Sequence, residues 1–102
     1  MRPRVPWMNE TDDTILEYLS QLEIDGGEYV TQSPTAVWVN LADQLDILDK
    51  SQSTIARRMQ HLEKMDLLKK TDEKRAYYRI TEKGLRYLAG DIGRDELPDP
   101  DS

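Results

Sequence analysis

Residues 51–90, SQSTIARRMQHLEKMDLLKKTDEKRAYYRITEKGLRYLAG, contain the pattern that decides the fold. Ser51 is a residue type that favours a helix N-cap, and apolar side chains follow it at helical spacing. This spacing predicts a helix that ends near residues 65–66 and buries one stripe of side chains, formed by Ile55, Met59 and Leu62.

Two β-prone segments follow this helix, at residues 67–71 and 76–80, with a polar turn between them. A last helix is expected between Thr81, as its N-cap, and Gly90, which stops it. Alternation along the second strand predicts that Ala76, Tyr78 and Ile80 face inward. Helical spacing after it gives apolar positions at Leu85 and Leu88, with Tyr87 beside them.

The first half of the chain adds two helices and a short strand. Asn9 and the acids after it favour a helix over about residues 10–23. Residues 29–31 are β-prone, and Ser33 with Pro34 favours a second helix that continues to about residue 46. The order is helix, strand, helix, helix, strand, strand, helix. It predicts a mainly α fold with a small β-hairpin wing, the winged helix-turn-helix arrangement.

The length of 102 residues fits one domain. We expect that domain to span residues 7–90, after an N-terminal arm at 1–6. Residues 91–102 combine prolines with acids and are predicted to form a disordered acidic tail.

The charge is unevenly distributed along the chain, whose formal net charge is −6. Residues 1–49 hold 2 basic and 10 acidic side chains, residues 50–90 hold 11 and 5, and residues 91–102 hold 1 and 5. The middle segment is therefore cationic between two acidic ones, which indicates a functional surface for an anionic partner. The acidic excess, rich in Asp, resembles proteins from salt-loving organisms, and an ordinary acidic protein of a mesophile is the alternative.

The composition also excludes several kinds of site. There is no Cys, so disulfides and thiolate metal sites are excluded, and one histidine, His61, cannot build a metal site alone. Asp12 and Asp13 are interpreted as compensating the dipole of the first helix. No nucleophile–base pair, phosphate loop or membrane span is recognisable, so we expect no enzyme, no cofactor, no small-molecule ligand and a cytoplasmic protein.

The helix predicted after Ser51 has an outward face that is polar and cationic. The positions three and four residues from Arg57, Arg58 and Lys64 carry no acid, although such neighbours usually balance a surface cation. An external anion would complete this face, and the DNA major groove admits one α-helix. We predict that the helix contacts DNA through Ser51, Gln52, Ser53, Thr54, Arg57, Arg58, Gln60 and Lys64.

Different roles are expected within this set. Gln52, Ser53 and Arg57 have the donors and acceptors that fit base edges. The hydroxyl groups of Ser51 and Thr54 suit phosphates. Arg58, on the flank of the helix, is expected to reach the DNA backbone. The hairpin is predicted to add a cationic ribbon formed by Lys69, Lys70, Lys74, Arg75 and Arg79. Solubility of an exposed edge is the alternative explanation for that ribbon.

Two stretches resemble a known family. SQSTIARRMQHLEKMDLLKK (residues 51–70) and YYRITEKGLRYL (77–88) resemble the recognition helix, wing and closing helix of winged helix-turn-helix transcription regulators. The chain is most similar to haloarchaeal regulators of the phage phi-H repressor type, which often begin with a Trp-Met pair, here Trp7 and Met8. The broader resemblance is to MarR- and PadR-like proteins. The connector at 44–50 is longer than the tight turn usual in the family.

The resemblance implies sequence-specific binding of double-stranded DNA and transcriptional control, commonly by a dimer. It would place Ser53, Thr54, Arg57 and Arg58 on the DNA-facing helix. We therefore expect a nucleoid-associated repressor or autoregulator that forms a homodimer. The alternative is a protein–protein module with the same fold, whose cationic face meets an acidic partner.

Overall fold

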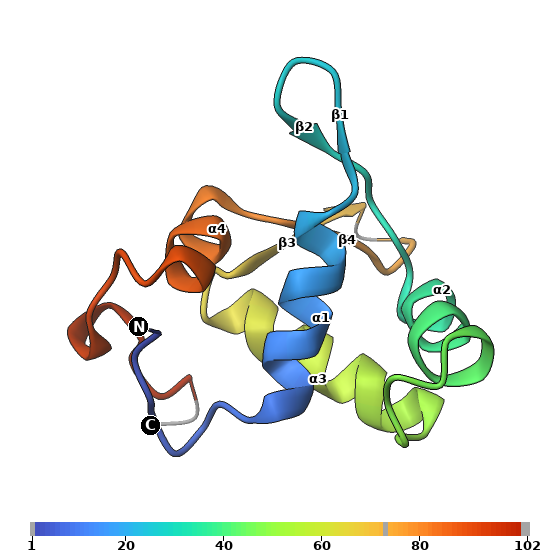
Figure 1. The fold of residues 1–102 in the computed structure, drawn as a ribbon, viewed down its shortest axis with the longest axis horizontal. Helices are drawn as coiled ribbons and strands as arrows, with labels where there is room; N and C mark the ends of the chain where they lie inside the picture. The colour runs from blue at the N-terminus through green and yellow to red at the C-terminus, as the bar shows by residue number, and fades with distance from the viewer. Residues whose placement is uncertain (1, 73, 101–102) are drawn as a thin grey trace.

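The computed structural model describes residues 2–72 and 74–100. Its elements follow the order of a winged helix (Figure 1). They are α1 (Glu10–Ser20), β1 (Glu23–Ile24), β2 (Glu28–Tyr29), α2 (Pro34–Trp38), the π-helix η1 (Val39–Gln44), α3 (Gln52–Lys64), β3 (Leu68–Asp72), β4 (Tyr77–Ile80), α4 (Glu82–Ala89) and the 3₁₀ helix η2 (Arg94–Glu96). The predicted fold class is confirmed.

The helix starts follow the capping signals in the sequence. Asn9, Ser33, Ser51 and Thr81 each accept a hydrogen bond from a backbone N–H in the first turn of their helix. At the other end of α4, Gly90 takes the left-handed conformation that stops the helix. α1 is shorter than predicted, since it ends at Ser20 and not near residue 23.

A first hairpin was missed by the sequence analysis, which predicted only a strand at residues 29–31. β1 and β2 pair antiparallel and project from the body of the protein (Figure 1). Gly26 and Gly27 turn the hairpin with positive φ angles, which glycine adopts without strain. The Asp-Gly step at Asp25 was the available signal.

The second helix is also less regular than predicted. α2 has five residues and continues as the π-helix η1, where a single helix to about residue 46 was expected. The connector to α3 includes Asp46, which takes a positive φ of 53°. The helix-turn-helix unit of this chain therefore has a loop where a tight turn is usual.

The wing pairs β3 with β4, and Leu68 lies opposite Ile80. Tyr78 and Ile80 are buried as predicted, whereas Ala76 is exposed because it lies in the turn before β4. In α4, Leu85 and Leu88 are half-buried and pack against the core, and Tyr87 beside them is buried more deeply. Gly84 fits α4 closely against the wing, because a Cβ there would lie 2.5 Å from the carbonyl oxygen of Leu67.

Both terminal segments pack against the core. Val5 and Ile92 are nearly buried and Leu97 is fully buried, and the Trp7 indole donates a hydrogen bond to the carbonyl of Leu97 over 3.0 Å. The predicted disorder is therefore wrong for residues 91–100, because two apolar side chains in this acidic segment give it enough burial to order. Residues 101–102 of that prediction lie outside the described residues.

Within the described residues, no helix is both long and apolar enough to cross a membrane. In the same part of the chain, no group of three or more metal-ligating side chains gathers to hold a metal ion.

Candidate nucleic-acid interface

α3 presents the outward face that the sequence predicts. Its apolar stripe is fully buried against the core. On the opposite side, the side chains that point to solvent are those of Ser53, Arg57, Gln60 and Lys64. The helix is therefore fixed by one face and free to contact a partner with the other.

The N-terminus of α3 carries a group of hydroxyl and amide side chains. The Ser51 hydroxyl oxygen accepts a hydrogen bond from the backbone N–H of Thr54 and lies 2.9 Å from the Thr54 hydroxyl and 3.2 Å from that of Ser53. The Gln52 amide donates to the hydroxyl oxygen of Thr35 over 2.5 Å. That bond leaves the Gln52 carbonyl oxygen and one N–H available for a base edge.

Thr35 was missed by the sequence analysis. It is exposed in the first turn of α2, and its bond to Gln52 joins the starts of the two helices. The signal that could have found it is its position directly after the Ser-Pro helix start, where a hydroxyl group is solvent-accessible.

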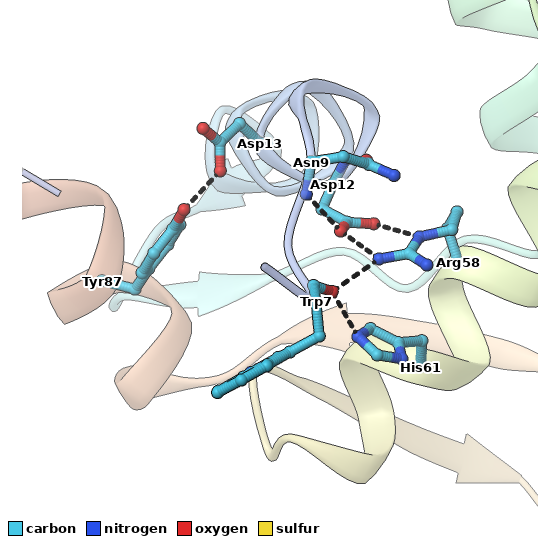
Figure 2. A network of polar contacts seen from close by, with 7 residues as sticks. All are labelled: Trp7, Asn9, Asp12, Asp13, Arg58, His61 and Tyr87. Atoms are coloured by element: carbon cyan, nitrogen blue, oxygen red, sulfur yellow. Dashed lines mark hydrogen bonds and ion pairs between the residues drawn. The ribbon is translucent and has the colours of Figure 1, made fainter. Parts of the chain in front are cut away.

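Arg58 does not belong to the outward face. Its Nε donates to Asp12 Oδ1 over 2.7 Å and its Nη2 to Asp12 Oδ2, so that the two side chains form a bidentate ion pair (Figure 2). Arg58 Nη2 also donates to the Trp7 carbonyl over 2.9 Å. The predicted contact between Arg58 and the DNA backbone is not what this geometry favours, because an acid in α1 already occupies the guanidinium.

The polar contacts around the start of α1 include two more side chains, those of His61 and Tyr87. Nε2 of the His61 ring lies 2.7 Å from the Trp7 carbonyl oxygen (Figure 2). Tyr87 donates its hydroxyl hydrogen to Asp13 over 2.5 Å. Burial, followed by this hydrogen bond, raises the pKa of the Tyr87 phenol above its usual value.

The wing divides its cations between two faces. Lys69 lies directly opposite Arg79, and like charges in that position destabilise a strand pair. Lys70 lies opposite the inward Tyr78 and so belongs to the other face, which corrects the predicted single ribbon. Lys74 and Arg75 are exposed at the turn.

Several of these cations have no acidic partner among the residues that the structure describes. The ion pairs recorded among residues 2–72 and 74–100 use Arg2, Arg58 and Arg86 as cations. In this part of the chain, Arg57, Lys64, Lys69 and Arg79 form none. Chemically, α3 and the wing face that carries Lys69 and Arg79 offer hydrogen-bond donors and positive charge to a polyanion.

Comparisons with known proteins identify the family and support the fold. The family model of the winged helix-turn-helix phage repressor matches residues 1–99. The chain is also similar to the crystal structure of the PhiH1 repressor-like protein from Haloarcula marismortui, with 33% sequence identity and a TM-score of 0.70. That likeness covers 92% of this chain and 93% of the other. No curated protein matches the chain.

Proposed function

This chain belongs to the winged helix-turn-helix phage repressor family of DNA-binding regulators, and we propose that it is a sequence-specific transcription regulator, acting as a repressor or autoregulator. In this proposal α3 enters the major groove of double-stranded DNA, and the wing lies on the backbone or in the minor groove. The main support for this proposal is the solvent-exposed side of α3, where Arg57 and Lys64 lack acidic partners among the described residues.

The chemistry of α3 supports separate roles for its two parts. Gln52, Ser53 and Arg57 lie in its first two turns, from which recognition helices reach base edges. The Ser51 and Thr54 hydroxyls lie beside the exposed N–H groups of the helix start and suit phosphate oxygens. Gln60 and Lys64 follow on the same side and would extend the contact along the groove.

The wing supports the same orientation. Lys69 and Arg79 repel one another in the free protein, and a phosphate between them would relieve that repulsion. Lys74 and Arg75, at the tip, can reach the backbone or the minor groove. Lys70 contributes positive charge from the opposite face.

We further propose that the protein acts as a homodimer on a pseudo-palindromic operator. One recognition helix makes few base contacts, and two half-sites about one helical turn apart add affinity and specificity. The acids of the remaining surface would repel phosphates and so penalise other orientations on DNA.

A salt-titrated binding assay tests the proposal. The wild-type chain is titrated with duplexes from its own upstream region and with random duplex of equal length. We expect tighter binding to the former, and an affinity that falls linearly with the logarithm of salt concentration. Equal binding to both duplexes at every salt concentration would contradict the proposal. Capture of an acidic protein without DNA binding would favour an interaction module instead.

A further inference from the structure

Asp12 differs from most acidic residues of this protein because its side chain is buried. Its side chain is 0% exposed, and its two oxygens make three hydrogen bonds. Oδ2 accepts from the backbone N–H of Asn9 over 2.9 Å, and both oxygens accept from Arg58. A buried carboxylate is costly unless it is paired and hydrogen-bonded in this way.

The ion pair joins two elements that are far apart in sequence. Asp12 lies in the first turn of α1, and Arg58 lies at the middle of α3, 46 residues later. The Trp7 carbonyl adds a second connection, because it contacts Arg58 and also His61, one turn further along α3 (Figure 2). Residues 7–12 therefore hold α3 at two successive turns.

This attachment is next to the proposed base contacts. Arg58 follows Arg57 directly, so the residue that is held and the residue that faces solvent share one turn of α3. The guanidinium fork fits a carboxylate in one plane, and this fixes both the distance and the rotation between the two helices. A lysine or an apolar contact would fix the rotation less well.

We propose that Asp12 is a positioning residue for DNA recognition, which acts through Arg58 to set the rotation of α3 and so the aim of Arg57 at base edges. Arg58 serves this purpose and does not contact phosphate. The inference rests on the proposed function. Under this proposal Asp12, a buried residue that does not contact DNA itself, influences the specificity of DNA binding.

The two roles of Arg58 predict opposite effects for Asp12→Asn. If Arg58 positions α3, the variant loses specific affinity because the fork has no charged partner. Binding to random duplex and its salt dependence stay near those of the wild type. If Arg58 were available to phosphate, loss of the Asp12 charge would release a cation. Binding to all duplexes would then tighten, with a steeper salt dependence.

The experiment measures specific and random duplex binding, over a range of salt, for the full chain and for Asp12→Asn, Arg58→Met and the double variant. Glu10→Gln is the matched control, because it removes one negative charge from the same helical turn at an exposed position. Circular dichroism confirms that each protein is folded at the assay temperature. If a single variant does not fold, the double variant, which leaves no unpaired charge, is compared with the wild type.

We expect each single variant to lose about tenfold in specific affinity, the discrimination that one side-chain contact to a base carries. The double variant should lose no more than that, since both changes break one interaction. Specific affinity equal to that of Glu10→Gln, or tighter binding by Asp12→Asn, would overturn the positioning role alone. A wild-type chain without preference for any duplex would overturn both this role and the proposed function.

Discussion

Arg57 and Arg58 are neighbours in α3, but the two sides of the helix to which they belong differ completely. Arg57 is exposed and has no acidic partner among the described residues. Arg58 is 23% exposed and forms a bidentate ion pair with a fully buried aspartate. Arginine thus faces solvent at one position of the helix and is paired inside the protein at the next.

The difference shows what decides the role of a cation in this fold. Arg58, on the flank of α3, lies against the acidic start of α1, and its charge is neutralised by Asp12 inside the protein. An arginine one position earlier is exposed and forms no ion pair among the described residues, so its charge remains available to an external partner. Charge counts along the sequence do not separate the two cases, whereas the packing of α1 against α3 does.

The largest expected effect is on stability, from Arg58→Ala. This change leaves the buried Asp12 carboxylate without its partner, which costs about 3–5 kcal/mol of unfolding free energy. Chemical denaturation followed by circular dichroism measures it. Arg94→Ala removes an equal charge from an exposed position and should change stability by less than about 0.5 kcal/mol. If Arg58→Ala and Arg94→Ala had equal free energies of unfolding, Arg58 would not have the structural role that distinguishes it from the exposed Arg57.

Arg57→Ala should have the opposite pattern. We expect the preference for the specific duplex to fall by about 1–3 kcal/mol, because the base contact is lost. The free energy of unfolding should remain within about 0.5 kcal/mol of wild type, since the side chain is exposed. Competition binding and denaturation measure the two quantities. If Arg57→Ala lowered the free energy of unfolding and left the preference for the specific duplex unchanged, Arg57 would have a structural role like that of Arg58.

Tyr87→Phe tests the other acid at the start of α1. Removing the hydroxyl deletes the bond to Asp13, and we expect a loss of about 1 kcal/mol at neutral pH. The raised pKa of Tyr87 means that the unfolded chain releases this proton first as pH rises. Wild-type stability should therefore fall above about pH 10, and the variant should fall less steeply. Parallel pH profiles of the two proteins would be inconsistent with this assignment.

The smallest expected effect is that of Lys74→Ala at the tip of the wing. Binding should weaken equally for specific and random duplexes, and the salt slope should decrease by about one, because a phosphate contact carries no sequence information. Titration at several salt concentrations gives both values. A change confined to the specific duplex would indicate that the wing contacts bases.

Local signals in the sequence predicted most of the fold. A cap such as Ser51 or Thr81 depends only on its own helical turn, so its hydroxyl group sets the start of the helix wherever the helix packs. The same holds for Gly90, whose left-handed conformation needs no tertiary partner. The packing of Ile92 and Leu97 was missed because composition alone does not show which apolar side chains find a place in the core.

The candidate site could be predicted only in part for a related reason. Helical spacing identifies neighbours within a helix, and it placed Arg57 on the outward face as observed. The partner of Arg58 is 46 residues away, and the partner of Gln52 is 17 residues away. Contacts of that kind depend on how the helices cross. The spacing of residues within one helix carries no information about that crossing.

The hydrogen bond between Trp7 and Leu97 spans 90 residues. Together with Leu97 in the core, it closes nearly the whole described chain into one loop. Because Val5, Ile92 and Leu97 belong to the same buried core as the apolar stripe of α3, opening of either terminal segment exposes part of that core. We therefore expect the acidic final segment to contribute to the cooperativity of folding. Its removal should loosen the packing of α3, although the two segments are far apart in the sequence.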